Sequence, residues 1–264
     1  MSRASKAPRV SGEVGFLDEG VVAPSRVPPM VAGLGDPRSI VGEELRLLRS
    51  RLRGAGKGTE LRCLALTSAL PSEGKSTLAV ALAAAVARDA GRRVLLSEGD
   101  LRRPTISEAL GLPPAPGVSE WLNGGLDQAP IRAVQPGGFW VLVAGQDSLD
   151  RPETLGSPLM ASLIRAARTS FDEVIVDVPP LLPVSDAILM QDLVDGFLLV
   201  VRSRVTPREA VLDALGRLRR EKIVGVVLND HREYRHSYST YAYERYGMAY
   251  PPKGRRERRC SLCA

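Results

Sequence analysis

The chain has 264 residues, of which 44% are hydrophobic and 25% are charged, and its formal net charge is +6. This is an ordinary composition for a soluble globular protein, and the length suits one large α/β domain with a proper core. The sequence lacks both the roughly 18 consecutive apolar residues of a membrane span and the apolar core of a signal peptide. We therefore expect a cytoplasmic protein that meets the inner face of the cell membrane only through a partner. The mild basic charge is not accompanied by an interleaved aromatic and basic surface, so we expect no nucleic-acid partner.

The N-terminal part of the chain divides into two segments. Residues 1–37 are rich in Pro, Gly and small polar residues, which predicts a disordered leader. From residue 38 the pattern changes, and apolar residues recur at helical spacing at Ile40, Leu45, Leu48 and Leu52. This spacing predicts an amphipathic helix, followed by a linker that ends at residue 60.

An alternation of strands and helices fills residues 61–230. Short apolar runs predict strands at 61–67, 92–97, 139–144, 172–178, 196–202 and 222–228. Helical patterns lie between some of these runs, at 76–91, 157–170 and 207–221. Because the strands are continuously apolar rather than alternating, we expect a mainly parallel sheet covered by helices on both faces. From 231 to 264 the chain is polar, basic and rich in tyrosine, and we expect a flexible tail.

A phosphate-binding loop is indicated where the first of these strands meets a helix. The sequence TSALPSEGKST ends in Gly74, Lys75 and Ser76, which is the second half of the P-loop pattern. Backbone N–H groups and the helix N-terminus bind phosphate oxygens, the lysine reaches the β- and γ-phosphates, and the serine hydroxyl binds magnesium. The first glycine of the pattern is replaced by Ala69, but the strand–loop–helix context supports the assignment. We therefore expect a P-loop NTPase fold.

Acidic residues follow two other predicted strands. Asp177 ends the run DEVIVD, while Glu98 and Asp100 follow the run VLLS. Ligands of open α/β sheets bind beyond the carboxyl ends of the strands. A carboxylate there can hold a magnesium ion and its water shell. These acids and the loop are thus predicted to meet at one edge of the sheet.

At this point the sequence resembles the bacterial tyrosine autokinases (BY-kinases) of capsule and exopolysaccharide synthesis. The resemblance covers about residues 38–250 and rests on motifs in the family's order: EELRLLR, TSALPSEGKST, VLLSEGDLRRP and VIVDVPPLLPVSDA. It implies ATP and Mg²⁺ as cofactors. It also implies a homo-oligomeric ring, a membrane-embedded polysaccharide co-polymerase as activator, and a tyrosine phosphatase. In that family the first motif joins subunits, and the corresponding residues here are Glu43, Glu44, Arg46 and Arg49.

Roles for individual residues follow from the motifs and the resemblance together. The ATP-binding set comprises Ser72, Glu73, Gly74, Lys75, Ser76, Thr77 and Asn229. The catalytic set comprises Lys75, Glu98, Asp100 and Asp177, and the magnesium set comprises Ser76, Asp177 and Glu98. Either Glu98 or Asp100 is expected to take or orient the proton of the attacking phenol, and the sequence does not choose between them. Arg102 and Arg103 are candidates for neutralising transition-state charge, or equally surface residues at a turn.

The sequence departs from the family pattern in the phosphate-binding loop and in the motif VLLSEGDLRRP. Ser72 stands where a glycine is usual. Glu98 stands where the family usually has Asp, which lengthens the side chain by one methylene. Because a misplacement of about 1 Å can lower a rate on the order of 10²-fold, low activity is one expectation.

All six tyrosines of the chain lie in the C-terminal segment. We interpret them as phosphoacceptors, against the alternative of an aromatic patch that packs on the core or on a partner: Tyr234, Tyr238, Tyr241, Tyr243, Tyr246 and Tyr250. The predicted function is ATP-dependent autophosphorylation of this cluster between subunits, regulating polysaccharide polymerisation and export. The alternatives are a switch ATPase of the cell-division or plasmid-partition type and a weakly active ATP-binding scaffold. Leu70 stands where the switch ATPases carry a signature lysine, which argues against the first alternative.

Overall fold

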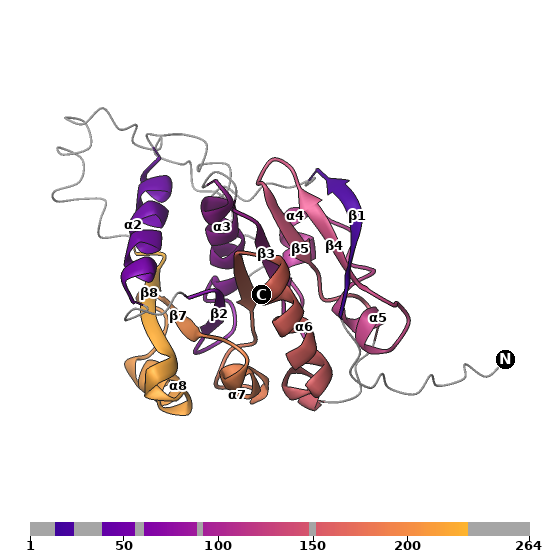
Figure 1. The fold of residues 1–264 in the computed structure, drawn as a ribbon. Helices are drawn as coiled ribbons and strands as arrows, with labels where there is room; N and C mark the ends of the chain where they lie inside the picture. The colour runs from indigo at the N-terminus through magenta and orange to yellow at the C-terminus, as the bar shows by residue number, and fades with distance from the viewer. Residues whose placement is uncertain (1–13, 24–38, 56–60, 89–91, 148–151, 232–264) are drawn as a thin grey trace.

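The computed structural model describes residues 14–23, 39–55, 61–88, 92–147 and 152–231. Within these ranges eight strands form one sheet in the order β1-β4-β5-β3-β6-β2-β7-β8 (Figure 1). The strands are β1 (Phe16–Val22), β2 (Cys63–Ser68), β3 (Val94–Glu98), β4 (Ala129–Val134), β5 (Phe139–Leu142), β6 (Glu173–Asp177), β7 (Gly196–Arg202) and β8 (Ile223–Asn229). Neighbouring strands run parallel, except that β4 and β5 are antiparallel. The predicted α/β fold with a mainly parallel sheet is confirmed.

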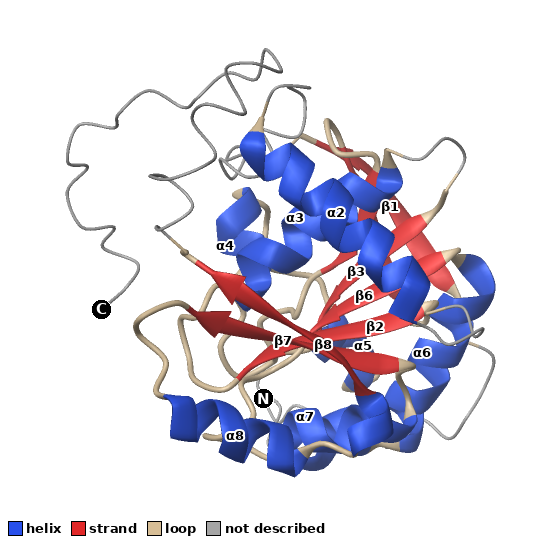
Figure 2. Ribbon diagram, turned by 90° about the vertical axis from the view of Figure 1, so that its left-hand side faces the viewer, coloured by secondary structure: helices blue, strands red, loops and turns tan. Residues whose placement is uncertain are grey.

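Helices cover the sheet on both faces, as Figure 2 shows for α2 and α3 on one side and α6, α7 and α8 on the other. The α-helices are α2 (Ile40–Ala55), α3 (Lys75–Ala87), α4 (Ile106–Leu110), α5 (Val118–Leu122), α6 (Pro158–Ser170), α7 (Asp186–Leu189) and α8 (Arg208–Arg217). Short 3-10 turns lie at Pro152–Gly156, Met190–Asp192 and Arg220–Lys222. No helix among the described residues is long and apolar enough to cross a membrane.

The central strands are buried because their alternate side chains enter two separate cores. In β2, Cys63 and Ala65 pack in the core under α6, whereas Leu64 and Leu66 pack in the core under α3. Successive strand residues point to opposite faces, so a strand covered on both sides needs apolar residues throughout. This explains the continuous apolar runs from which the strands were predicted. Helix α3 is likewise buried almost all round, which matches its alanine-rich sequence.

The expectation of a disordered leader over 1–37 is wrong for the segment that forms β1. This strand pairs in parallel with β4, and the carbonyls of Gly15 and Val22 accept N–H groups of Ala129 and Gln135. Phe16 also packs edge-on against Phe171, with the ring centroids 5.6 Å apart. Most β1 side chains are exposed at the edge of the sheet, so the strand has no apolar pattern that reveals it. The remaining leader residues, 1–13 and 24–37, lie outside the described ranges.

The middle of the chain also holds elements that the sequence did not indicate. Strand β4 and helices α4 and α5 occupy the polar, proline-rich stretch between β3 and β5.

The helix expected over 38–53 does form, as α2, and it packs on α3 through Leu45. The parallel register pairs Leu66 with Asp177 and Glu98 with Asp177. The ends of β2, β3 and β6 therefore meet at one edge of the sheet.

Candidate active site

The loop between β2 and α3 is shaped by two residues with a left-handed backbone. Ser72 has φ 63° and Gly74 has φ 91°. A Cβ at Gly74 would lie 2.2 Å from Nδ2 of Asn229, so any other residue would displace that amide and adopt a strained backbone. That amide, at the end of β8, donates to the carbonyl oxygen of Glu73 at 2.9 Å. A loop bent in this way before a helix N-terminus presents N–H groups to an anion, and its geometry fits the phosphates of a nucleotide.

Serine at position 72 is less well suited to this loop than glycine. A left-handed backbone is less favourable for an L-residue by roughly 1 kcal/mol. The loop nevertheless keeps its shape because the Glu73 side chain is buried and accepts two hydrogen bonds. They come from the Leu70 backbone N–H at 3.0 Å and from the Thr206 hydroxyl. Thr206 was not singled out from the sequence, although it lies in the segment VTPREA that follows β7.

Lys75 forms the centre of a buried charged cluster. Its Nζ lies 3.0 Å from Oδ2 of Asp100 and 3.3 Å from Oδ1 of Asp177. Asp177 is fully buried, and the side chain of Lys75 is 9% exposed. Burial raises the pKa of Asp177 and the Lys75 ammonium opposes this. Burial lowers the pKa of Lys75, but Asp177 and Asp100 outweigh it and the net shift is upward.

This cluster carries one positive and two negative charges beside the phosphate loop, a formal sum of −1 when both acids are ionised. Ser76 joins it, because its hydroxyl accepts a hydrogen bond from Lys75 Nζ at 3.3 Å. Thr77 is exposed on the first turn of α3. No group of three or more His, Cys, Asp or Glu residues among the described residues could hold a metal by itself. Mg²⁺ usually takes one or two carboxylates together with substrate phosphates. Asp177 offers such a carboxylate, and Ser76 offers a hydroxyl oxygen beside the phosphate loop.

Glu98 lies next to Asp177 in the sheet register, but its carboxylate is bonded to other segments of the chain. Its Oε1 accepts the backbone N–H groups of Thr105 at 2.5 Å and Ile106 at 2.7 Å, and its Oε2 accepts that of Ala144 at 3.0 Å. The side chain is buried, and burial raises its pKa to about 7. Both carboxylate oxygens are thus engaged in tying the end of β3 to the start of α4 and to the segment after β5. The structure joins Lys75, Ser76, Asp100 and Asp177 by hydrogen bonds and ion pairs, whereas the carboxylate of Glu98, although next to Asp177 in the sheet, bonds to other segments.

The neighbouring arginines differ in their surroundings. Arg102 donates from Nε to Oδ2 of Asp186 at 2.6 Å, and its side chain is about half exposed. The backbone N–H of Arg103 donates to Oδ1 of Asp100 at 3.1 Å, which fixes that carboxylate for its contact with Lys75. Arg102 is therefore paired with Asp186, which lies near the end of the motif VIVDVPPLLPVSDA, while the backbone N–H of residue 103 orients Asp100.

The residues predicted to join subunits do not lie on one face of α2. Glu43 and Arg46 form an ion pair on the surface, with the Arg46 Nε donating at 2.8 Å, and Glu44 is exposed. Arg49 instead points under the helix and lines a pocket. The six predicted phosphoacceptor tyrosines lie outside the described residues, which end at 231.

The loop, the buried lysine and the acids at neighbouring strand ends define a P-loop nucleotide-binding protein. The chain is similar to tyrosine-protein kinase YwqD of Bacillus subtilis, at 33% identity over 217 residues, covering 81% of this chain and 91% of YwqD. It is 39% identical over 199 residues to the succinoglycan biosynthesis transport protein ExoP of Rhizobium meliloti, covering 73% of this chain but only 25% of ExoP. No protein-family model matches the sequence.

Solved structures agree with these relatives. The kinase domain of the Escherichia coli tyrosine kinase ETK matches with a TM-score of 0.71 and 32% identity, covering 81% of this chain and 85% of that domain. The cell division ATPase MinD of Pyrococcus furiosus shares the fold, at a TM-score of 0.52 and 23% identity over 70% of this chain and 78% of its own. Given its similarity to YwqD over nearly the whole of that protein, this chain belongs to the bacterial tyrosine kinase (BY-kinase) family. It is a protein-tyrosine kinase.

Proposed function

We propose that this kinase transfers the γ-phosphate of ATP to tyrosines of its own C-terminal segment, between subunits of a homo-oligomeric ring. The observation that carries this proposal is the buried cluster of Lys75, Asp100 and Asp177 beside the phosphate loop. All six tyrosines of the chain lie between residues 234 and 250. Because residues 1–233 contain no tyrosine, every tyrosine that this chain offers as a substrate lies in that segment.

The geometry supports a division of roles among the acids. The loop amides and Lys75 would hold the phosphates, while Ser76 and Asp177, the latter through water, would hold Mg²⁺, which neutralises charge on the transferring phosphoryl group. Asp100 would accept the phenol proton as the phenolic oxygen bonds to the γ-phosphorus and ADP leaves. A phenol with a pKa near 10 needs such help at neutral pH. Asp100 is favoured over Glu98 because both oxygens of Glu98 already accept backbone N–H groups. Asn229, one of the predicted ATP-binding residues, holds the loop through its hydrogen bond to the Glu73 carbonyl and would contact the adenine.

The wider role is proposed from the relatives. One of them is named as a succinoglycan biosynthesis transport protein, which supports regulation of exopolysaccharide polymerisation and export. We propose that a membrane-embedded co-polymerase activates the kinase and holds it at the inner face of the membrane. A tyrosine phosphatase would reset the modified segment. Each phosphotyrosine adds roughly −1.5 to −2 charges, enough for several to reverse the charge of this basic segment.

Intact-mass analysis tests the proposed reaction. Purified full-length chain incubated with Mg-ATP should gain several phosphate masses that phosphatase removes and that peptide mapping places within residues 234–250. A variant with all six tyrosines changed to Phe should gain none. Steady phosphate release from ATP without any gain in mass would instead indicate a switch ATPase. A chain that binds ATP but neither gains phosphate nor releases it, even after addition of an activator's cytoplasmic segment, would be an ATP-binding scaffold.

A further inference from the structure

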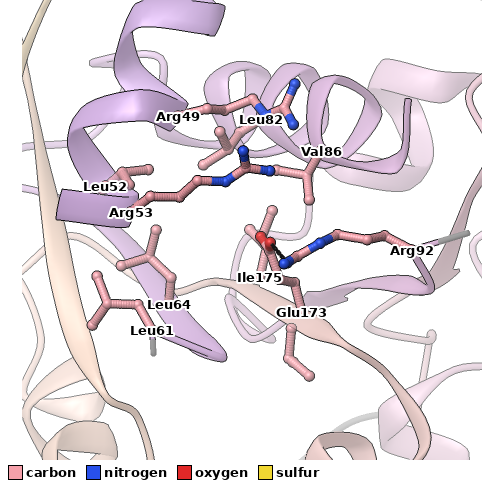
Figure 3. A pocket seen from close by; sticks show the side chains of 11 residues that line it. Arg49, Leu52, Arg53, Leu61, Leu64, Leu82, Val86, Arg92, Glu173 and Ile175 are labelled. Atoms are coloured by element: carbon pink, nitrogen blue, oxygen red, sulfur yellow. Dashed lines mark hydrogen bonds and ion pairs between the residues drawn. The ribbon is translucent and has the colours of Figure 1, made fainter. Parts of the chain in front are cut away.

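A pocket of about 400 Å³ lies beneath α2, at the opposite edge of the sheet from the phosphate loop. Figure 3 shows its lining, which comes from α2, α3 and the starts of the strands. Arg92 stands just before β3 and Glu173 begins β6, so these residues mark the amino ends of the strands. A strand of five residues is about 17 Å long, so the pocket and the Lys75 cluster are separate sites.

Three arginines converge on one carboxylate in this pocket. Arg92 forms an ion pair with Glu173, and the side chains of the two residues are 31% and 20% exposed. Burial raises the pKa of Glu173, while Arg92, Arg53 and Arg49 each lower it, so all three guanidinium groups act on this carboxylate. Among the described residues that line the pocket, three positive charges and one negative charge give a formal sum of +2. Arg53 and Arg92 reach into the pocket from opposite sides (Figure 3).

The remaining lining of the pocket is aliphatic. It comprises Leu52, Leu61, Leu64, Leu82, Val86, Val174 and Ile175. Guanidinium groups recognise phosphate with paired, charge-assisted hydrogen bonds. An aliphatic floor provides contact area for a ring. A ligand that is both aromatic and doubly negative therefore matches the shape and charge of the pocket better than a bare anion does.

We propose that this pocket binds a phosphotyrosine of the chain's own C-terminal segment. The proposal rests on the proposed function, which makes that group. The segment from His231 to Tyr246 spans 15 residues and can extend over roughly 50 Å, so it can reach the opposite edge of the sheet. Binding there holds the product away from the Lys75 cluster and beneath α2. A modified segment is thereby recognised by the kinase that carries it.

Binding of a synthetic peptide tests this proposal without any kinase reaction. The probe is a fluorescent peptide of residues 240–250 with phosphotyrosine at position 246, titrated in anisotropy against full-length, dephosphorylated chain without ATP. Arg53→Glu should weaken binding at least about tenfold, because it reverses a charge in the recognition site. Arg51→Glu is the matched control, since Arg51 is exposed on the same helix and does not line the pocket. It should bind like the unaltered chain. Glu173→Gln should tighten binding, because it removes the competing carboxylate.

Three results would overturn the proposal. In the first, the Arg53→Glu variant binds the phosphotyrosine peptide as tightly as the unaltered chain does. In the second, the unaltered chain binds the unphosphorylated peptide as tightly as the phosphotyrosine peptide. In the third, it binds a phosphoserine peptide equally tightly, which would leave the aliphatic floor without a role. Because the phosphate is introduced by synthesis, a failure here leaves the autokinase reaction standing. Conversely, a chain that binds the peptide but gains no phosphate from Mg-ATP would contradict the proposed function alone.

Discussion

Replacing Lys75 by Met should reduce tyrosine phosphorylation of the chain by about 10³-fold or more, a size typical of removing a charge that stabilises phosphoryl transfer. Lys75 is the cation between the phosphate loop and the acids Asp100 and Asp177. Methionine fills similar space but offers no charge to the β- and γ-phosphates. The rate is measured as the initial gain of phosphate per chain by intact mass. A variant that keeps more than a hundredth of the rate would contradict this role.

The same substitution should also weaken the fold, and this effect has to be separated from the loss of chemistry. Without Lys75, the fully buried Asp177 has lost its cation. Removing one partner of a buried pair typically costs about 3–5 kcal/mol. The double variant Lys75→Met with Asp177→Asn removes the stranded charge. We expect it to regain most of the free energy of unfolding in urea and to remain inactive.

Replacing Glu98 by Ala should lower the free energy of unfolding by about 3 kcal/mol or more, which is large for one substitution. The carboxylate accepts three backbone N–H groups, from Thr105, Ile106 and Ala144. Each buried donor left unpaired costs about 1–3 kcal/mol. Glu98→Asp should also destabilise the protein, because the shorter arm cannot reach the same donors. Urea unfolding of the three proteins, side by side, gives the comparison.

Glu98→Gln distinguishes a positioning role from a catalytic one. The glutamine oxygen can still accept the N–H groups of Thr105 and Ile106, while the Ala144 N–H faces an amide nitrogen. We expect a loss of about 1–3 kcal/mol from this one unpaired donor and activity within a few-fold of the unaltered chain. A folded Glu98→Gln variant without activity would show that Glu98 acts in the reaction or on the metal, as the motif alone indicates.

Much of this site could be predicted because its parts lie next to strands with a strong pattern. Burial on both faces makes β2 and β6 continuously apolar, and the residues that follow such strands in a parallel sheet meet at one edge. Lys75 and Asp177 therefore follow from local sequence. Asp100 does as well, although its contact with Lys75 depends on the turn after β3 and on the backbone N–H of residue 103.

The direction of the Glu98 side chain could not be predicted in the same way. Its hydrogen-bond donors come from residues 105–106 and from 144, and no local pattern shows that these segments meet. Strand β1 was missed for a related reason, since its pairing with β4 uses backbone groups and most of its side chains are exposed. Arg49 belongs to a motif for subunit contacts, but its position four residues after the buried Leu45 places it on the inner face of α2.

The central claim is the transfer of phosphate to the C-terminal tyrosines of a neighbouring subunit, and it is tested most directly by mixing a chain that lacks the catalytic lysine with a chain that lacks the acceptor tyrosines. One chain carries Lys75→Met with all its tyrosines, and the other keeps Lys75 but has the six tyrosines changed to Phe. Neither chain alone should gain phosphate from Mg-ATP. In the mixture, intact mass should show phosphate on the Lys75→Met chain, mapping to residues 234–250. If the Lys75→Met chain stays unmodified while the unaltered protein phosphorylates itself, the proposal of transfer between subunits is wrong.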